Sequence, residues 1–158
     1  MSLKIEIAQD TASQRIKRAF KRLEDSDIRK DIMRTAAGAL QESTEYAFEH
    51  ERDLETNAPW LPWSDNWREW REEHGYTPGK ILTLSGQLAA SMTTEYGDDY
   101  ALIGSNKPYA AIHQWGGLPT MPPGPAAIPA RPYMGLDDIG ESMIYAAIQK
   151  ALNDAMQE

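Results

Sequence analysis

Residues 102–117 read LIGSNKPYAAIHQWGG, residues 118–127 read LPTMPPGPAA, and residues 128–136 read IPARPYMGL. The first block predicts the end of a strand and then a short helix that Pro108 begins and that Gly116 and Gly117 close. Residues 117–132 contain six prolines, so an extended or mobile loop is expected there rather than part of a core. The stretch therefore predicts two fixed anchors on either side of a loop.

The hydrophobic pattern of the remaining chain predicts helices around one small sheet. Leu3, Ile5 and Ile7 alternate with polar residues, which predicts a short strand with one buried face. Helical spacing predicts helices over residues 12–24, from about 27 to 52, over 64–74 and 85–90, and from about 137 to 155. Strands over 91–96 and 100–105 flank Gly97-Asp98-Asp99, a strong turn signal. We expect one α+β domain over residues 1–158, with a small, mainly antiparallel sheet packed against the long helix and further helices at both termini.

Three of these helices carry specific packing expectations. The long helix has small residues at 36–39, and Gly38 there suggests close approach of another element. In the first helix the spacing predicts an apolar packing face of Ile16, Ala19, Phe20 and Leu23. In the last helix the residues predicted to be buried are Ile139, Met143, Ala147, Ile148, Ala151, Leu152 and Ala155.

Composition excludes several classes of protein. The chain has 158 residues and no cysteine, which rules out a disulfide scaffold, a thiol nucleophile and a cysteine-ligated zinc site. No run of about 18 apolar residues is present, and the N-terminus lacks the apolar core of a signal peptide. We expect a soluble protein made in the cytoplasm, with no membrane partner.

Charge is distributed unevenly along the chain. The formal net charge is −8, yet residues 11–30 hold seven Lys or Arg against three acids. This cluster is first interpreted as a solvated helix face, and second as one half of a contact between basic and acidic faces of neighbouring copies. Nucleic-acid binding ranks last, because an acidic chain repels phosphate and the cluster carries no aromatic residue beyond Phe20.

Catalytic and metal-binding patterns are missing. His50, His74 and His113 lie far apart in the sequence and fit no metal-ligand spacing. His113 is expected to be a structural histidine bonded to nearby backbone, with a polar contact to a neighbouring subunit as the alternative. Ser64-Asp65-Asn66 matches one motif of penicillin-binding enzymes by chance, since the companion motifs are absent. We predict no enzyme activity.

A loop with unusual apolar content lies at residues 53–66. Pro59 and Pro62 exclude a helix interior. Trp60 and Leu61 lie between the two prolines, and Trp63 follows the second one. These rings are expected to fold back onto the domain as a small additional core. The alternative is that one or more of them lies at a subunit interface, where tryptophan is enriched.

Five segments together resemble the phage virion morphogenesis family, the tail-completion proteins of Mu-like and related tailed phages. They are residues 60–64 (WLPWS), 81–88 (ILTLSGQL), 103–106 (IGSN), 108–117 (PYAAIHQWGG) and 128–136 (IPARPYMGL), in the family's order. The signature residues carried over are Trp60, Trp63, Tyr109, His113, Gln114, Trp115, Gly116, Gly117, Pro129, Arg131, Pro132 and Tyr133.

The resemblance implies a structural virion protein that completes the tail at its head-proximal end and helps it join the head. It implies a ring of identical copies, for which a hexamer is one option. It also implies the tail tube and head–tail connector proteins as partners. It implies no cofactor, no catalytic residue and no direct nucleic-acid contact, and it places the chain in the virion tail or neck after assembly in the bacterial cytoplasm. A head-closure or connector-adaptor protein of the neck is the alternative.

Two hypotheses follow for the residues around the loop. Arg131 is expected to bond carboxylate or carbonyl groups near His113 and Gln114. Loop residues 118–127 are expected to contact the partner, so that their deletion would leave a folded domain unable to join tails to heads.

Overall fold

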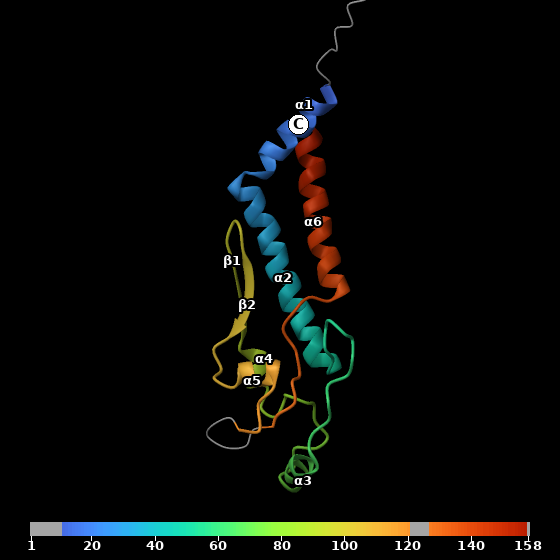
Figure 1. Cartoon of the computed structure of the whole chain (residues 1–158), viewed down its shortest axis with the longest axis vertical. Coiled ribbons are helices and arrows are strands. Elements are labelled where there is room, and N and C mark those ends of the chain that lie inside the picture. The colour runs from blue at the N-terminus through green and yellow to red at the C-terminus, as the bar shows by residue number, and fades with distance from the viewer. Residues whose placement is uncertain (1–10, 121–126, 158) are drawn as a thin grey trace, which may run out of the picture.

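The computed structural model describes residues 11–120 and 127–157, and these form an elongated α+β fold (Figure 1). The elements are α1 (Thr11–Leu23), α2 (Ser26–His50), α3 (Asp65–Glu73), α4 (Gln87–Ala90), β1 (Met92–Tyr96), β2 (Ala101–Ser105), α5 (Ala110–Trp115) and α6 (Asp138–Gln157). None of these helices is long and apolar enough to cross a membrane. The strand expected over residues 3–7 lies outside the described residues.

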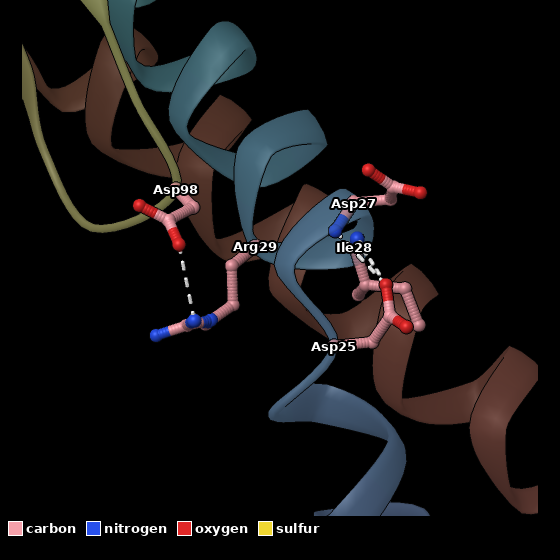
Figure 2. Close-up of polar contacts among 5 residues, drawn as sticks. All are labelled: Asp25, Asp27, Ile28, Arg29 and Asp98. Carbon is pink, nitrogen blue, oxygen red and sulfur yellow. Dashed lines mark hydrogen bonds and ion pairs between the residues drawn. The ribbon is translucent and has the colours of Figure 1, made fainter.

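The long helix α2 begins at a side-chain cap. The carboxylate of Asp25 accepts hydrogen bonds from the backbone amides of Asp27 at 2.9 Å and Ile28 at 3.4 Å, as Figure 2 shows. These amides have no partner inside the helix, so the cap stabilises its first turn. The helix ends at His50 because Glu51 adopts a left-handed conformation with φ 55°. Its predicted extent is therefore confirmed to within two residues.

The predicted hairpin is also confirmed, and it packs on α2. Strands β1 and β2 pair in antiparallel register from Met92–Ser105 to Tyr96–Ala101. Arg29 in the first turn of α2 forms an ion pair with Asp98 in the hairpin turn at 3.2 Å (Figure 2). The hairpin lies along one side of α2, and α6 lies along another (Figure 1). Both the hairpin and α6 therefore pack against α2.

The packing face predicted for α6 is partly wrong. Ile139 and Ile148 are 67% and 41% exposed. The helix instead turns Gly140 toward α2, where a Cβ atom would lie 2.5 Å from Ser43 Oγ. Small residues then recur at helical spacing behind Gly140, at Ala147, Ala151 and Ala155, and all three are at least partly buried. Close approach of the two helices selects this face and leaves the larger isoleucines outside.

The packing face expected for α1 is also only partly confirmed, because Ala19 and Leu23 are buried or partly buried but Ile16 and Phe20 are not, and the packing reason expected for Gly38 is wrong. In α1 only Ala19 is fully buried, while Ile16 and Phe20 are 45% and 60% exposed, because α1 contacts α6 and only the start of α2. Gly38 is exposed, and a Cβ atom there would meet nothing within 4 Å. Its cost in helix propensity, about 1 kcal/mol relative to alanine, has no packing reason within the subunit.

Side-chain caps and left-handed glycines set the ends of three further helices. Ser64 Oγ accepts from Trp67 N at 3.3 Å at the start of α3, and Gly75 follows its end with φ 75°. Helix α4 begins two residues later than predicted, at Gln87, because Gly86 takes a left-handed conformation with φ 73°. Asp137 caps α6 by accepting from Gly140 N at 2.7 Å.

The hydrophobic core sits at the end of α2 that is remote from α1. It consists of Ala47, Phe48, Trp60, Leu88, Met92, Ala110 and Tyr133. The ring of Phe48 lies 5.0 Å from that of Tyr133 and 5.9 Å from that of Trp60, centroid to centroid. Trp60 therefore folds back onto the domain as predicted, but it belongs to the main core rather than to a small additional one.

Candidate functional site

The two anchors predicted around the proline-rich loop are joined by the side chain of Gln114. Its Oε1 atom accepts from the backbone amides of Tyr133 at 2.9 Å and Met134 at 3.0 Å. Its Nε2 atom donates to the carbonyl oxygen of Met134 at 3.3 Å. Gln114 is buried, so one amide group replaces the partners that this non-helical backbone lacks.

Backbone hydrogen bonds bring the ends of the loop together. Gly117 N donates to Ile128 O at 2.9 Å, and Arg131 N donates to His113 O at 2.8 Å. Gly116 has φ 81°, and a Cβ atom on it would lie 2.9 Å from Ala130 N. Only glycine combines this backbone conformation with such a close approach. The loop thus leaves and re-enters the fold at one place, as the two-anchor pattern predicts.

Tyr133 and Trp60 tie this junction into the core. The Tyr133 hydroxyl donates to Ala110 O at 2.8 Å, and Trp60 Nε1 donates to Pro132 O at 2.8 Å. Burial raises the pKa of Tyr133 to about 12, since the phenolate would be poorly solvated there. The second anchor is therefore fixed by two aromatic side chains: its own Tyr133 donates to Ala110, and Trp60 of another segment donates to Pro132.

The side chain of Arg131 bonds carbonyl oxygens, as expected, but these carbonyls do not belong to the helix that carries His113 and Gln114. Its side chain is buried, and it donates to carbonyl oxygens of Leu61 and Pro62 at 2.8 and 2.9 Å rather than to groups of the α5 helix. Only its backbone amide bonds His113. The guanidinium therefore joins the Trp60–Trp63 segment to the second anchor.

Trp63 is held by a residue that the sequence did not single out for this role. The guanidinium carbon of Arg71 lies 4.0 Å from the centroid of the Trp63 ring. Arg71 is 2% exposed, and it also donates to the carbonyl oxygens of Tyr76 and Lys80. Its position in α3 beside Trp67 and Trp70 was visible in the sequence, but the contact depends on the fold of residues 61–63.

A groove of about 720 Å³ opens beside this junction, between residues 61–67, residues 81–88, α5 and residues 127–131. Of the predicted signature residues, Trp63, Tyr109, His113, Pro129 and Arg131 line it. Ala127, the last loop residue, is also in its wall. The structure thus gathers these side chains, from three separate segments of the chain, around one surface depression.

His113 lines this groove without the backbone bond expected of it. Its Nδ1 atom is buried and has no hydrogen-bond partner among the described residues, and its ring meets the Tyr109 ring edge-on at 6.1 Å. Burial lowers the pKa of His113, and the positive charge of Arg131 lowers it further. The imidazole is therefore neutral at pH 7.

Trp115 is the signature residue that lies apart from the network. It follows Gln114 directly, yet its side chain is 73% exposed. Leu118, at the start of the loop, is 65% exposed. Two large apolar side chains thus stand in solvent where the loop leaves the fold. Residue type alone did not distinguish the exposed tryptophan from the buried Trp60.

No group of three or more potential metal-ligating side chains occurs in residues 11–120 and 127–157. The polar groups that do meet are bonded to backbone, as with Gln114 and Arg131. Such bonds fix chain segments relative to one another. The arrangement is therefore a hydrogen-bonded, partly apolar surface at which the two ends of the loop are fixed.

The chain matches the model of the phage virion morphogenesis family over residues 11–153. It is 52% identical to the "Putative capsid assembly protein G" of Escherichia phage Mu over 158 residues, which span the whole of both chains. It is 35% identical to the "Mu-like prophage FluMu G protein 1" of Haemophilus influenzae over 98% of this chain and 99% of that one. The "Mu-like prophage FluMu G protein 2" is 34% identical, over 92% of this chain and 94% of that one.

No solved structure matches the chain. The family match covers most of the sequence, and the identity to the phage Mu protein extends from end to end. Both findings support a structural role in phage assembly. The chain belongs to the phage virion morphogenesis family.

Proposed function

We propose that this protein completes the phage tail at its head-proximal end and so makes the tail competent to join the head. The observation that carries the proposal is the hydrogen-bonded junction of the two signature segments. Gln114, Gly117 and Arg131 fix both ends of the proline-rich loop on a rigid base. A loop held in this way is displayed for contact with another protein at a lower entropic cost than a free segment.

The proposed working form is a ring of identical copies. A ring requires that a patch on one copy meets a different patch on the next. The elongated subunit, with exposed apolar side chains such as Trp115, Leu118 and Tyr145, offers surface for such contacts. The tail tube and a head–tail connector protein are the proposed partners on the two faces of the ring.

A second candidate function is a role in building the head. The observation that favours it is the name of the phage Mu relative, which refers to capsid assembly. A third candidate is a neck protein that closes the head or adapts its connector. All three roles use a structural protein, and they differ in which particle is defective when the protein is missing.

Electron micrographs of lysates made without this protein separate the candidates. Tail completion predicts DNA-filled heads and separate tails, with tails of uneven length or without a finished head-proximal end. A role in capsid assembly predicts aberrant heads or none, and that result would overturn the proposal. Leaking, empty heads beside normal tails would point to head closure.

A further inference from the structure

Helix α1 presents an amphipathic face that no residue in the described ranges 11–120 and 127–157 covers. Ile16 and Phe20, one helical turn apart, are 45% and 60% exposed. Lys17 and Lys21 have the same spacing and are exposed beside them. The helix carries five basic residues and no acid over Thr11–Leu23. A basic face with an apolar flank can dock on an acidic protein surface, because complementary charges steer the encounter and apolar side chains are buried in the contact.

The outer face of α2 has the complementary character. Gly38, Glu42, Glu45 and Glu49 recur at intervals of four, three and four residues, so they share one side of the helix. All four are exposed, opposite the side that packs on the hairpin and the core. Tyr46, 37% exposed, adds apolar surface beside the glutamates.

The nearest basic groups leave this face acidic. Arg34 is paired with Asp31 at 3.1 Å, one turn before Gly38. Lys80 Nζ donates to the backbone carbonyl of Glu49 at 2.8 Å rather than to its carboxylate. Gly38, where a Cβ atom would meet nothing within 4 Å, leaves one end of this face flat for a neighbouring helix.

The α1 helix of the same subunit does not reach this face. It packs against α6 and the first part of α2, at the opposite end of the molecule from the core (Figure 1). At about 1.5 Å per residue, Glu42 lies roughly 24 Å along α2 from Ser26, and Glu49 lies farther still. Contact between the two faces therefore needs two molecules.

We infer that α1 of one copy docks on the outer face of α2 of a second copy, through Lys17, Lys21, Ile16 and Phe20 on one side and the three glutamates on the other. The contact joins different patches of identical chains, so one copy of a docked pair keeps a free α2 face, the other keeps a free α1 face, and further copies can add until a ring closes. This names the interface for the proposed ring, on whose existence it rests.

A charge-reversal experiment tests the docking. The variant Lys17→Glu/Lys21→Glu and the variant Glu42→Lys/Glu45→Lys/Glu49→Lys should each weaken self-association at least about tenfold, measured by sedimentation at low salt. An equimolar mixture of the two variants should associate again like the wild type, with the two variants alternating, because each reversed face meets a complementary face on the other variant. The control Glu72→Lys/Glu73→Lys, which changes exposed acids of α3, should associate like the wild type.

Cross-linking gives a second measurement, because the natural chain has no cysteine. Under mild oxidation, Lys21→Cys mixed with Glu45→Cys should yield a disulfide-linked heterodimer. Lys21→Cys mixed with Glu73→Cys should yield much less. Equal yields from both mixtures, or a wild-type chain that stays monomeric at high concentration and low salt, would overturn the interface.

A binding assay with duplex DNA tests whether the basic face of α1 binds nucleic acid instead of a second copy of the protein. Retention of DNA at physiological salt that the α1 variant loses, with no change in self-association, would assign the face to nucleic acid instead. These measurements need no phage. They can therefore fail while the tail-completion proposal stands, or succeed while micrographs assign the ring to another step of assembly.

Discussion

The side-chain oxygen of Gln114 accepts the backbone amide hydrogen of Tyr133 at a nitrogen–oxygen distance of 2.9 Å, which links the two segments on either side of the proline-rich loop. The same oxygen also serves Met134. One side chain therefore satisfies two backbone donors of a segment that belongs to no helix or sheet, and the stability of the junction depends on it.

Replacing Gln114 with alanine should lower the free energy of unfolding by about 2–4 kcal/mol, because two backbone amides lose their partner inside the fold. Urea denaturation measures the change. The matched control is Gln149→Ala on the exposed side of α6, which should change stability by no more than about 0.5 kcal/mol. Equal effects of the two substitutions would show that the junction does not depend on Gln114.

Glycine substitutions should have opposite effects at two positions. Gly116→Ala forces a left-handed backbone conformation on alanine and a clash with Ala130, so it should destabilise the protein by about 2 kcal/mol or more. Gly38→Ala, on an exposed helix face, should stabilise the folded subunit by up to about 1 kcal/mol. Thermal melting of both variants checks this, and a loss of stability in Gly38→Ala would reveal a contact missed within the subunit.

Stability at alkaline pH should depend on Tyr133. The unfolded tyrosine ionises near pH 10, whereas the folded one keeps its proton to about pH 12. The unfolded state therefore binds fewer protons between these values, and stability falls as the pH rises through them. Tyr133→Phe should lower stability at pH 7 by about 1–2 kcal/mol and should flatten this alkaline decline. An unchanged decline in the variant would exclude Tyr133 as its source.

Stability at mildly acidic pH should depend on His113. Its folded pKa is lowered, so below about pH 6.5 the unfolded chain takes up a proton at this residue that the folded chain does not. Stability should then fall as the pH falls, until the folded form is protonated too. His113→Gln should remove part of the slope between pH 7 and pH 5. An unchanged slope in the His113→Gln variant would exclude His113 as its source.

The loop should be separable from the fold. Because Gly117 N bonds Ile128 O, a short glycine–serine linker can replace residues 118–127 without moving either anchor. The variant should keep wild-type circular dichroism and a melting temperature within a few degrees, yet fail to restore plaques to a phage lacking the protein. Normal plaque numbers would show that the loop is not needed for phage assembly.

The sequence predicted the local elements well because their signals are local. Ser64 caps α3, Asp137 caps α6, and Gly97-Asp98-Asp99 turns the hairpin, each through side chains next to the element concerned. The ends of the loop were found in the same way. The two signature segments lie close in the sequence and end in glycines and prolines whose backbone preferences are strong.

What the sequence did not predict depends on distant pairings. Arg131 bonds the carbonyl of Leu61, seventy residues away, and nothing in the composition of either segment sets that register. The rotation of α6 follows from close approach at Gly140 and Ser43, so the isoleucines that periodicity placed inside lie outside.

The most direct test of tail completion is an order-of-addition experiment with purified parts. Heads and tails are separated from a lysate made without the protein, one of the two is incubated with the purified protein, the excess is removed, and the other is added. We predict that pretreated tails join untreated heads and restore infectious particles, whereas pretreated heads with untreated tails do not. Restoration from pretreated heads alone would contradict the account.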